Sequence, residues 1–119
     1  MTTVKKNMVP PLLALPGLEH DAQLSVISAR ETHRQNVQAA AVYKASVEAD
    51  VARNQEWKND AQRKAATADG LNTPAYLELL ETVEESSTAV ATAETDAAYY
   101  RHMRQVLLAE IDQRKLDSM

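Results

Sequence analysis

The chain has 119 residues, of which 45% are hydrophobic and 25% are charged, with a formal net charge of −4. This length fits one domain, and the lack of cysteine excludes a disulfide framework and thiolate metal sites. The acidic balance argues against a nucleic-acid or anionic-membrane binder, because both need excess positive charge. No apolar run reaches the roughly 18 residues of a membrane span.

The N-terminal residues 1–17 contain three of the four prolines and one of the two glycines, which opposes a long helix. We therefore expect an extended, proline-rich arm that presents Leu12, Leu13 and Leu15. Two interpretations remain open: the arm folds back on its own helices, or it docks on a neighbouring subunit or partner. The prolines and the lack of a cleavage site disfavour a signal peptide. We expect a soluble chain, in the cytoplasm or within a particle rather than secreted.

The remainder, residues 18–119, is predicted to form a helical hairpin. Residues 18–69 and 75–119 contain neither proline nor glycine and are rich in helix-favouring side chains. The sequence predicts one helix over about 21–69, a turn over 70–73 and a second helix over about 74–116.

The predicted turn contains residues that typically end one helix and begin the next. Gly70 is expected just beyond the first helix, where a positive φ is easy for glycine. Thr73 is expected to cap the second helix through its hydroxyl group, and Pro74 to occupy the first helical position. These residues are explained by capping alone.

Apolar residues at spacings of three and four predict that the two helices pair as an antiparallel coiled coil. In the predicted register Ala65 faces Leu79, Val47 faces Ala97, and His33 faces Ile111. The predicted seam consists of Val37, Val47, Val51, Ala61, Ala65, Leu79, Val83, Val90, Ala97, Tyr100, Leu107 and Ile111.

A stripe made largely of Ala and Val buries little apolar area, so such a hairpin usually joins a larger helical bundle. The same register leaves the start of the first helix without partners. We therefore expect protein contacts at six leucine and isoleucine side chains: Leu12, Leu13, Leu15, Leu18, Leu24 and Ile27.

The sequence contains no pattern typical of catalysis. None of its three histidines lies in a zinc or di-iron motif, and no phosphate-binding glycine loop or nucleophile signature is present. We expect no enzyme activity, metal or cofactor.

The sequence favours a non-catalytic structural subunit that forms homo-oligomers through helical packing and its apolar arm. A virion or phage-particle component, or another repeating assembly, fits this profile. The alternative is an adaptor or regulatory module whose hairpin docks on one larger protein partner.

Overall fold

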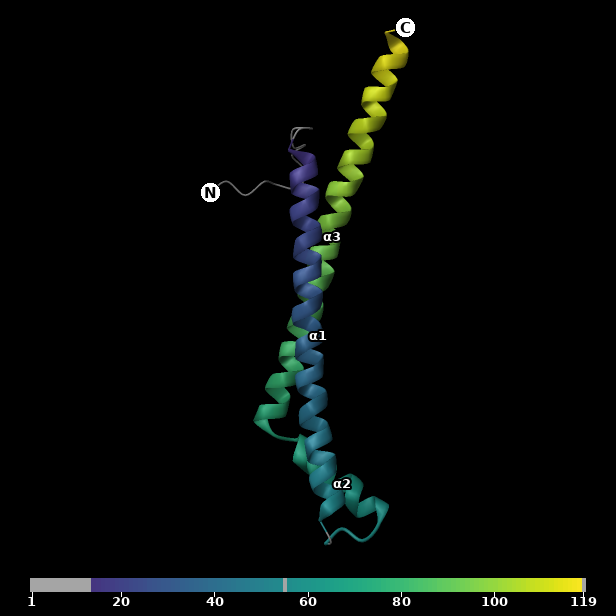
Figure 1. Cartoon of the computed structure of the whole chain (residues 1–119). Helices are drawn as coiled ribbons and strands as arrows, with labels where there is room; N and C mark the ends of the chain where they lie inside the picture. Colours follow the sequence, from purple (N-terminus) through teal and green to yellow (C-terminus); the bar gives the residue numbers. More distant parts are fainter. Residues whose placement is uncertain (1–13, 55, 119) are drawn as a thin grey trace. The chain divides into compact units, whose positions relative to one another are not determined.

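The structure is a computed structural model that describes residues 14–54 and 56–118. It contains three helices, α1 (Leu15–Arg53), α2 (Asp60–Leu71) and α3 (Pro74–Asp117), and α1 packs against α3 (Figure 1). The described residues contain no strand. The predicted all-α class and the hairpin-like pairing of two long helices are therefore confirmed.

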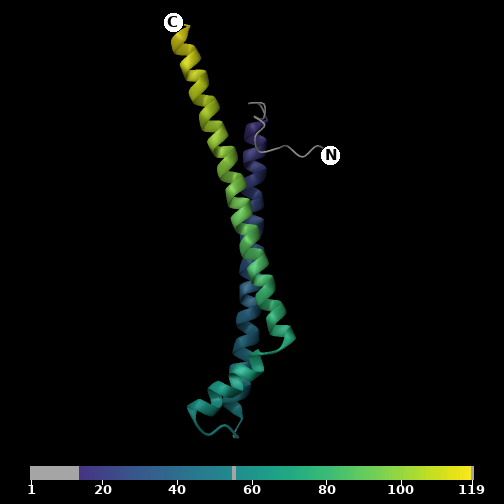
Figure 2. The same cartoon turned by 180° about the vertical axis from the view of Figure 1, so that it is seen from behind.

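The chain divides into two compact units, and both long helices contribute to each. Unit 1 comprises Met1–Ser28 and Ala91–Met119, and unit 2 comprises Ala29–Val90, which includes α2. Within each unit a segment of α1 runs beside a segment of α3 (Figure 2).

The helix predicted over residues 21–69 is interrupted after Arg53, so that prediction is wrong. α1 ends at Arg53, and the Asn54 side chain accepts a hydrogen bond from the N–H of Glu56 (3.0 Å). Asn59 then caps α2 by accepting the N–H of Gln62 (2.8 Å), while the Gln62 side chain accepts the N–H of Lys58 (2.8 Å). Together these two hydrogen bonds resemble a capping box, a pattern that starts a helix without proline or glycine.

The start of α1 also differs from the prediction, because Leu15, Pro16 and Gly17 are helical rather than extended. The N–H of Leu18 donates to the carbonyl of Ala14 (3.1 Å). Pro16 lies in the first turn, where its missing N–H has no helical acceptor, so the helix tolerates it. Leu12 and Leu13 of the expected arm lie outside the described residues.

The connection from α2 to α3 confirms two of the expected caps and corrects the third. Thr73 Oγ1 accepts the N–H of Tyr76 (3.3 Å), and Pro74 is the first residue of α3. Gly70, however, lies inside α2, and no described residue has a positive φ. A Cβ atom on Gly70 would lie 2.6 Å from Cγ1 of Val47. Gly70 therefore allows α2 to approach α1 closely.

The predicted register of the two long helices is wrong. In unit 2, His33 contacts Ser86 rather than Ile111, a shift of 25 residues or roughly seven helical turns along α3. The break after Arg53 is the reason for this shift. The residues that follow the break form the separate helix α2 instead of continuing the first helix. α3 consequently starts level with Tyr43, whose hydroxyl lies 2.9 Å from Thr73 Oγ1.

The least exposed positions of α1 and α3 recur at spacings of three and four residues. In unit 2 they are Ala29, His33, Asn36, Ala40, Tyr43, Val47 and Val51 of α1, with Tyr76, Leu79, Val83, Ser86 and Val90 of α3. This spacing forms one stripe along each helix. The hydrophobic residues that are buried among the described ones are few: Leu15, Ala22 and Val26 in unit 1, and Ala40 in unit 2. The core of each unit is therefore thin.

Candidate interaction surfaces

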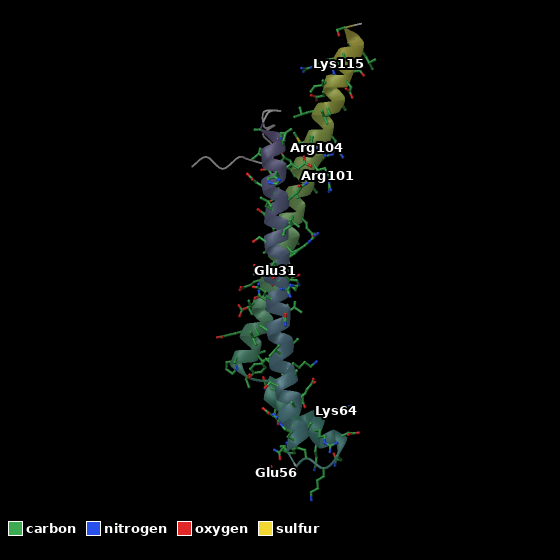
Figure 3. All side chains as sticks on the ribbon, in the orientation of Figure 1. Glu31, Glu56, Lys64, Arg101, Arg104 and Lys115 are labelled. Carbon is green, nitrogen blue, oxygen red and sulfur yellow. The ribbon has the colours of Figure 1, made fainter. Side chains whose placement is uncertain are left out.

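In unit 1 a charged pair joins the two helices. Arg104 of α3 donates through Nε to Oε2 of Glu19 on α1 (2.7 Å) and through a terminal nitrogen to Oε1 (3.3 Å). The Glu19 side chain is 12% exposed and that of Arg104 is 39% exposed. Figure 3 shows Arg104 on α3. This two-point contact fixes guanidinium orientation as well as charge, so it helps to set the register in unit 1.

A shallow, open groove of about 210 Å³ lies beside this contact in unit 1. Its lining comes from both helices: Leu18, Asp21, Ala22, Ser25, Ala93, Asp96 and Tyr100. Alanine at two of these positions leaves space between the helices that larger side chains would fill. Among the described residues, no group of three or more histidine, aspartate or glutamate side chains could hold a metal ion.

In unit 2 a hydrogen bond joins the helices at His33 and Ser86. The Ser86 hydroxyl donates to the carbonyl of Val83 (2.9 Å) and lies 2.9 Å from Nδ1 of His33. A hydroxyl that donates to Val83 accepts from Nδ1 of His33 in the tautomer that carries a proton there. Ser86 is also buried. The arrangement satisfies two seam side chains and does not direct the serine proton toward a base.

Thr73 is the centre of a second polar cluster in unit 2. Its hydroxyl oxygen lies within hydrogen-bond distance of both the Tyr43 hydroxyl and the N–H of Tyr76. The rings of Tyr43 and Tyr76 stack with centroids 5.4 Å apart and an interplanar angle of 25°. The cap therefore also ties α3 to α1. Sequence reasoning found the cap but missed Tyr43, because the predicted register placed this residue elsewhere.

On the outer surface of α1, Arg34 binds two neighbours of its own helix. It donates to both carboxylate oxygens of Glu31 (3.0 and 2.6 Å) and to the side chain of Gln38 (3.5 Å). The hydrogen bond from Arg34 and its charge lower the pKa of Glu31, and the same contact raises the pKa of Arg34. Both groups are exposed, so the pair is a local helix contact.

Large apolar side chains lie exposed on both long helices. They are Leu24, Ile27, Val37, Val42, Leu77, Leu80, Val106, Leu108 and Leu116. Two of the predicted contact residues, Leu24 and Ile27, are 50% and 62% exposed. Leu18 is half-buried and Leu15 is fully buried, so these two are unsuited to an outer surface.

The predicted seam residues fall into three groups. Exposed positions are Val37 on α1 and Ala61 and Ala65 on α2, and Asn36 takes the seam position that was assigned to Val37. In unit 2 the half-buried members are Val47, Val51, Leu79, Val83 and Val90, and in unit 1 they are Ala97, Tyr100, Leu107 and Ile111. All the predicted seam residues on α3 are thus half-buried, as are Val47 and Val51 on α1, whereas Val37 is exposed.

Comparison of the chain with family models, with curated proteins and with solved structures finds no match. In the part of the chain that the structure describes, none of the helices is apolar over enough of its length to span a bilayer. The features of the described residues that bear on function are the exposed apolar side chains and the polar contacts between helices.

Proposed function

We propose that this chain is a non-catalytic assembly subunit that associates with copies of itself through the outer surfaces of its paired helices. The apolar N-terminal segment, with Leu12 and Leu13, serves as a further contact with a neighbouring subunit. A repeating particle such as a virion is a setting in which a small helical subunit of this kind works.

One observation carries the proposal: large apolar side chains lie exposed on both long helices. Among the described residues nine large hydrophobic side chains are exposed, whereas four hydrophobic residues are buried, two of them alanines. Association would cover these exposed apolar side chains.

The side chains capable of chemistry support a structural role. His33 and Ser86, the serine–histidine contact in unit 2, have their protons committed to seam hydrogen bonds. Glu19 and Arg104 neutralise each other across the helices of unit 1. These groups hold helices together, so we assign no catalytic step to them.

The spacing of half-buried positions supports a coiled-coil interpretation of the pairing. Positions that recur after three and four residues along both helices are the pattern of knobs-into-holes packing. Two-helix coiled coils of this kind gain stability when further helices cover their outer faces.

The concentration dependence of thermal unfolding tests the proposal. Circular dichroism melts at about 2 µM and about 200 µM should differ in midpoint by roughly 5–15 °C, because mass action stabilises an oligomer. A midpoint independent of concentration, in a chain with full helicity, would contradict self-association. A complex of fixed stoichiometry with one larger protein would then favour the adaptor alternative.

A further inference from the structure

One flank of the helix pair in unit 2 combines exposed apolar side chains with charges of opposite sign on its two helices. Val37 follows the seam position Asn36 by one residue, and Leu80 follows the seam position Leu79 by one. One residue turns a helix by about 100°, and equivalent positions of antiparallel helices lie on the same side of the pair. Val37 and Leu80 therefore border the seam on the same side, where they are 43% and 42% exposed.

Residues three or four positions away extend this surface along each helix. We call it the Val37–Leu80 flank, and it consists of Arg34, Val37 and Ala41 of α1 with Leu77, Leu80 and Glu84 of α3. The two halves span the same length of the seam, because His33 meets Ser86 and Tyr43 meets Tyr76. The flank lies entirely within unit 2.

We propose that the Val37–Leu80 flank is the interface at which two copies of this chain form a two-fold symmetric four-helix bundle. This inference rests on the proposed function and identifies the surface that carries it. The occupant is a second copy because the α1 half of the flank carries Arg34 and the α3 half carries Glu84, two side chains of opposite charge. Such a surface complements itself when two copies meet face to face.

A two-fold axis parallel to the helices places α1 of one copy over α3 of the other, antiparallel and at the same level. Val37 and Ala41 then pack against Leu80 and Leu77 of the second copy. Arg34 lies beside Glu84 of the second copy, and symmetry makes each of these contacts twice. The apolar centre and its charged edge form one continuous surface.

The charged side chains are available for this contact. Arg34 uses three N–H groups for Glu31 and Gln38, which leaves two of the five donors of an arginine. Within the described residues, no ion pair or hydrogen bond engages the Glu84 carboxylate. Pairing between copies would supply it with a partner.

Exchange of the two charges tests the interface. Arg34→Glu and Glu84→Arg, each alone, should raise the dimer dissociation constant at least about 10-fold, because each creates two like-charge pairs. An equimolar mixture of the two variants should form heterodimers with a dissociation constant within about threefold of the wild-type value, because both pairs regain opposite charges. Glu85→Arg, the adjacent residue on the other side of α3, is the matched control and should leave dimerisation unchanged.

Sedimentation equilibrium, with circular dichroism to verify helicity, gives these constants. If the wild-type chain associates but both charge variants behave like Glu85→Arg, or if mixing fails to restore association, the flank is not the interface and the proposed function stands. If the wild-type chain is a helical monomer at about 200 µM, both proposals fail.

Cysteine cross-linking gives a second measurement that does not depend on charge variants. The chain has no cysteine, so each introduced thiol is unique. Mixed Ala41→Cys and Leu77→Cys chains should form a disulfide-linked heterodimer, whereas mixed Val42→Cys and Leu77→Cys chains should not. Equal cross-linking of both mixtures would overturn the assignment of the flank.

Discussion

The two units fix the pairing of the same two helices by different means. In unit 1 a charged pair, Glu19 with Arg104, spans the helices beside seam residues as small as Ala22. In unit 2 the contacts include neutral hydrogen bonds such as that between the hydroxyl groups of Tyr43 and Thr73. Removing one member of a partly buried ion pair leaves the other charge without a partner, which is costly. A neutral hydrogen bond contributes about 1 kcal/mol to stability, and salt does not weaken it. Unit 1 should therefore respond more strongly to salt and to loss of its polar contact.

The largest effect is expected at the close helix contact of unit 2. Gly70→Ala should lower the free energy of unfolding by about 1–3 kcal/mol, because the new methyl group would lie 2.6 Å from the stiff, β-branched Val47. At a helix site with open space the same change would stabilise by about 1 kcal/mol. Urea denaturation gives the sign.

A second substitution on the facing helix is the control for this prediction. Val47→Ala removes the methyl group that the new Cβ would meet. Combined with Gly70→Ala, it should therefore cost less than the sum of the two single changes. Strict additivity, or a gain in stability from Gly70→Ala alone, would argue against close packing of α2 on α1.

The next largest effect is expected in unit 1. Arg104→Met should lower the free energy of unfolding by about 1–2 kcal/mol, because the mostly buried Glu19 carboxylate loses its partner. Because Arg104 is partly exposed, this loss in the free energy of unfolding is smaller than the loss expected for a fully buried ion pair. The difference from wild type should shrink in about 1 M salt, which screens charge within about 3 Å.

Neutralising the partner as well provides the comparison. Glu19→Gln combined with Arg104→Met leaves no stranded charge, so the double variant should recover part of the lost stability. A loss from Arg104→Met that is equal at low and high salt would mean that packing of the arginine stem, rather than charge, holds unit 1 together.

A smaller effect is expected at the His33–Ser86 contact of unit 2. Ser86→Ala should cost about 0.5–1.5 kcal/mol, because Nδ1 of His33 loses its hydrogen-bond partner. The loss should be the same at low and high salt, in contrast to that of Arg104→Met. The neighbouring Ser87 is exposed, and Ser87→Ala should leave urea midpoints nearly unchanged. Equal effects of Ser86→Ala and Ser87→Ala would contradict the role of Ser86 in the contact between the helices.

The smallest effect is expected on the surface of α1. Glu31→Gln should lower the thermal midpoint by about 1 °C or less at neutral pH, because exposed ion pairs contribute little. Its contact with Arg34 lowers the pKa of Glu31 in the folded chain. The carboxylate therefore stabilises above its unfolded pKa, and the contribution disappears as pH falls through the folded value. Melts at pH 7 and about pH 3 should show the difference vanish, and a difference that grows at low pH would contradict this assignment.

Much of the fold followed from residues that act locally. The long stretches without proline or glycine predicted two long helices, and Thr73 with Pro74 predicted the start of α3. The break between the first two helices was missed because asparagine side chains, rather than proline or glycine, form it. Asn59 followed by Gln62 was the available signal, since that spacing is a helix-start pattern.

The register could not be obtained from helical periodicity. A shift of 25 residues is about three and a half heptads, so the apolar stripes still face each other after the shift. The choice between registers depends on where the chain turns, and the predicted turn lacked α2. Glu19 with Arg104 and Tyr43 with Thr73 were missed for this reason, because each pair is close only in the observed register.

The native mass of the chain tests the central claim, self-association, most directly. Sedimentation equilibrium over about 2–200 µM should give at least twice the 13.2 kDa mass of one chain at the upper end, with a reversible shift toward monomer on dilution. A constant mass of 13.2 kDa across that range, with helicity unchanged, would contradict the account.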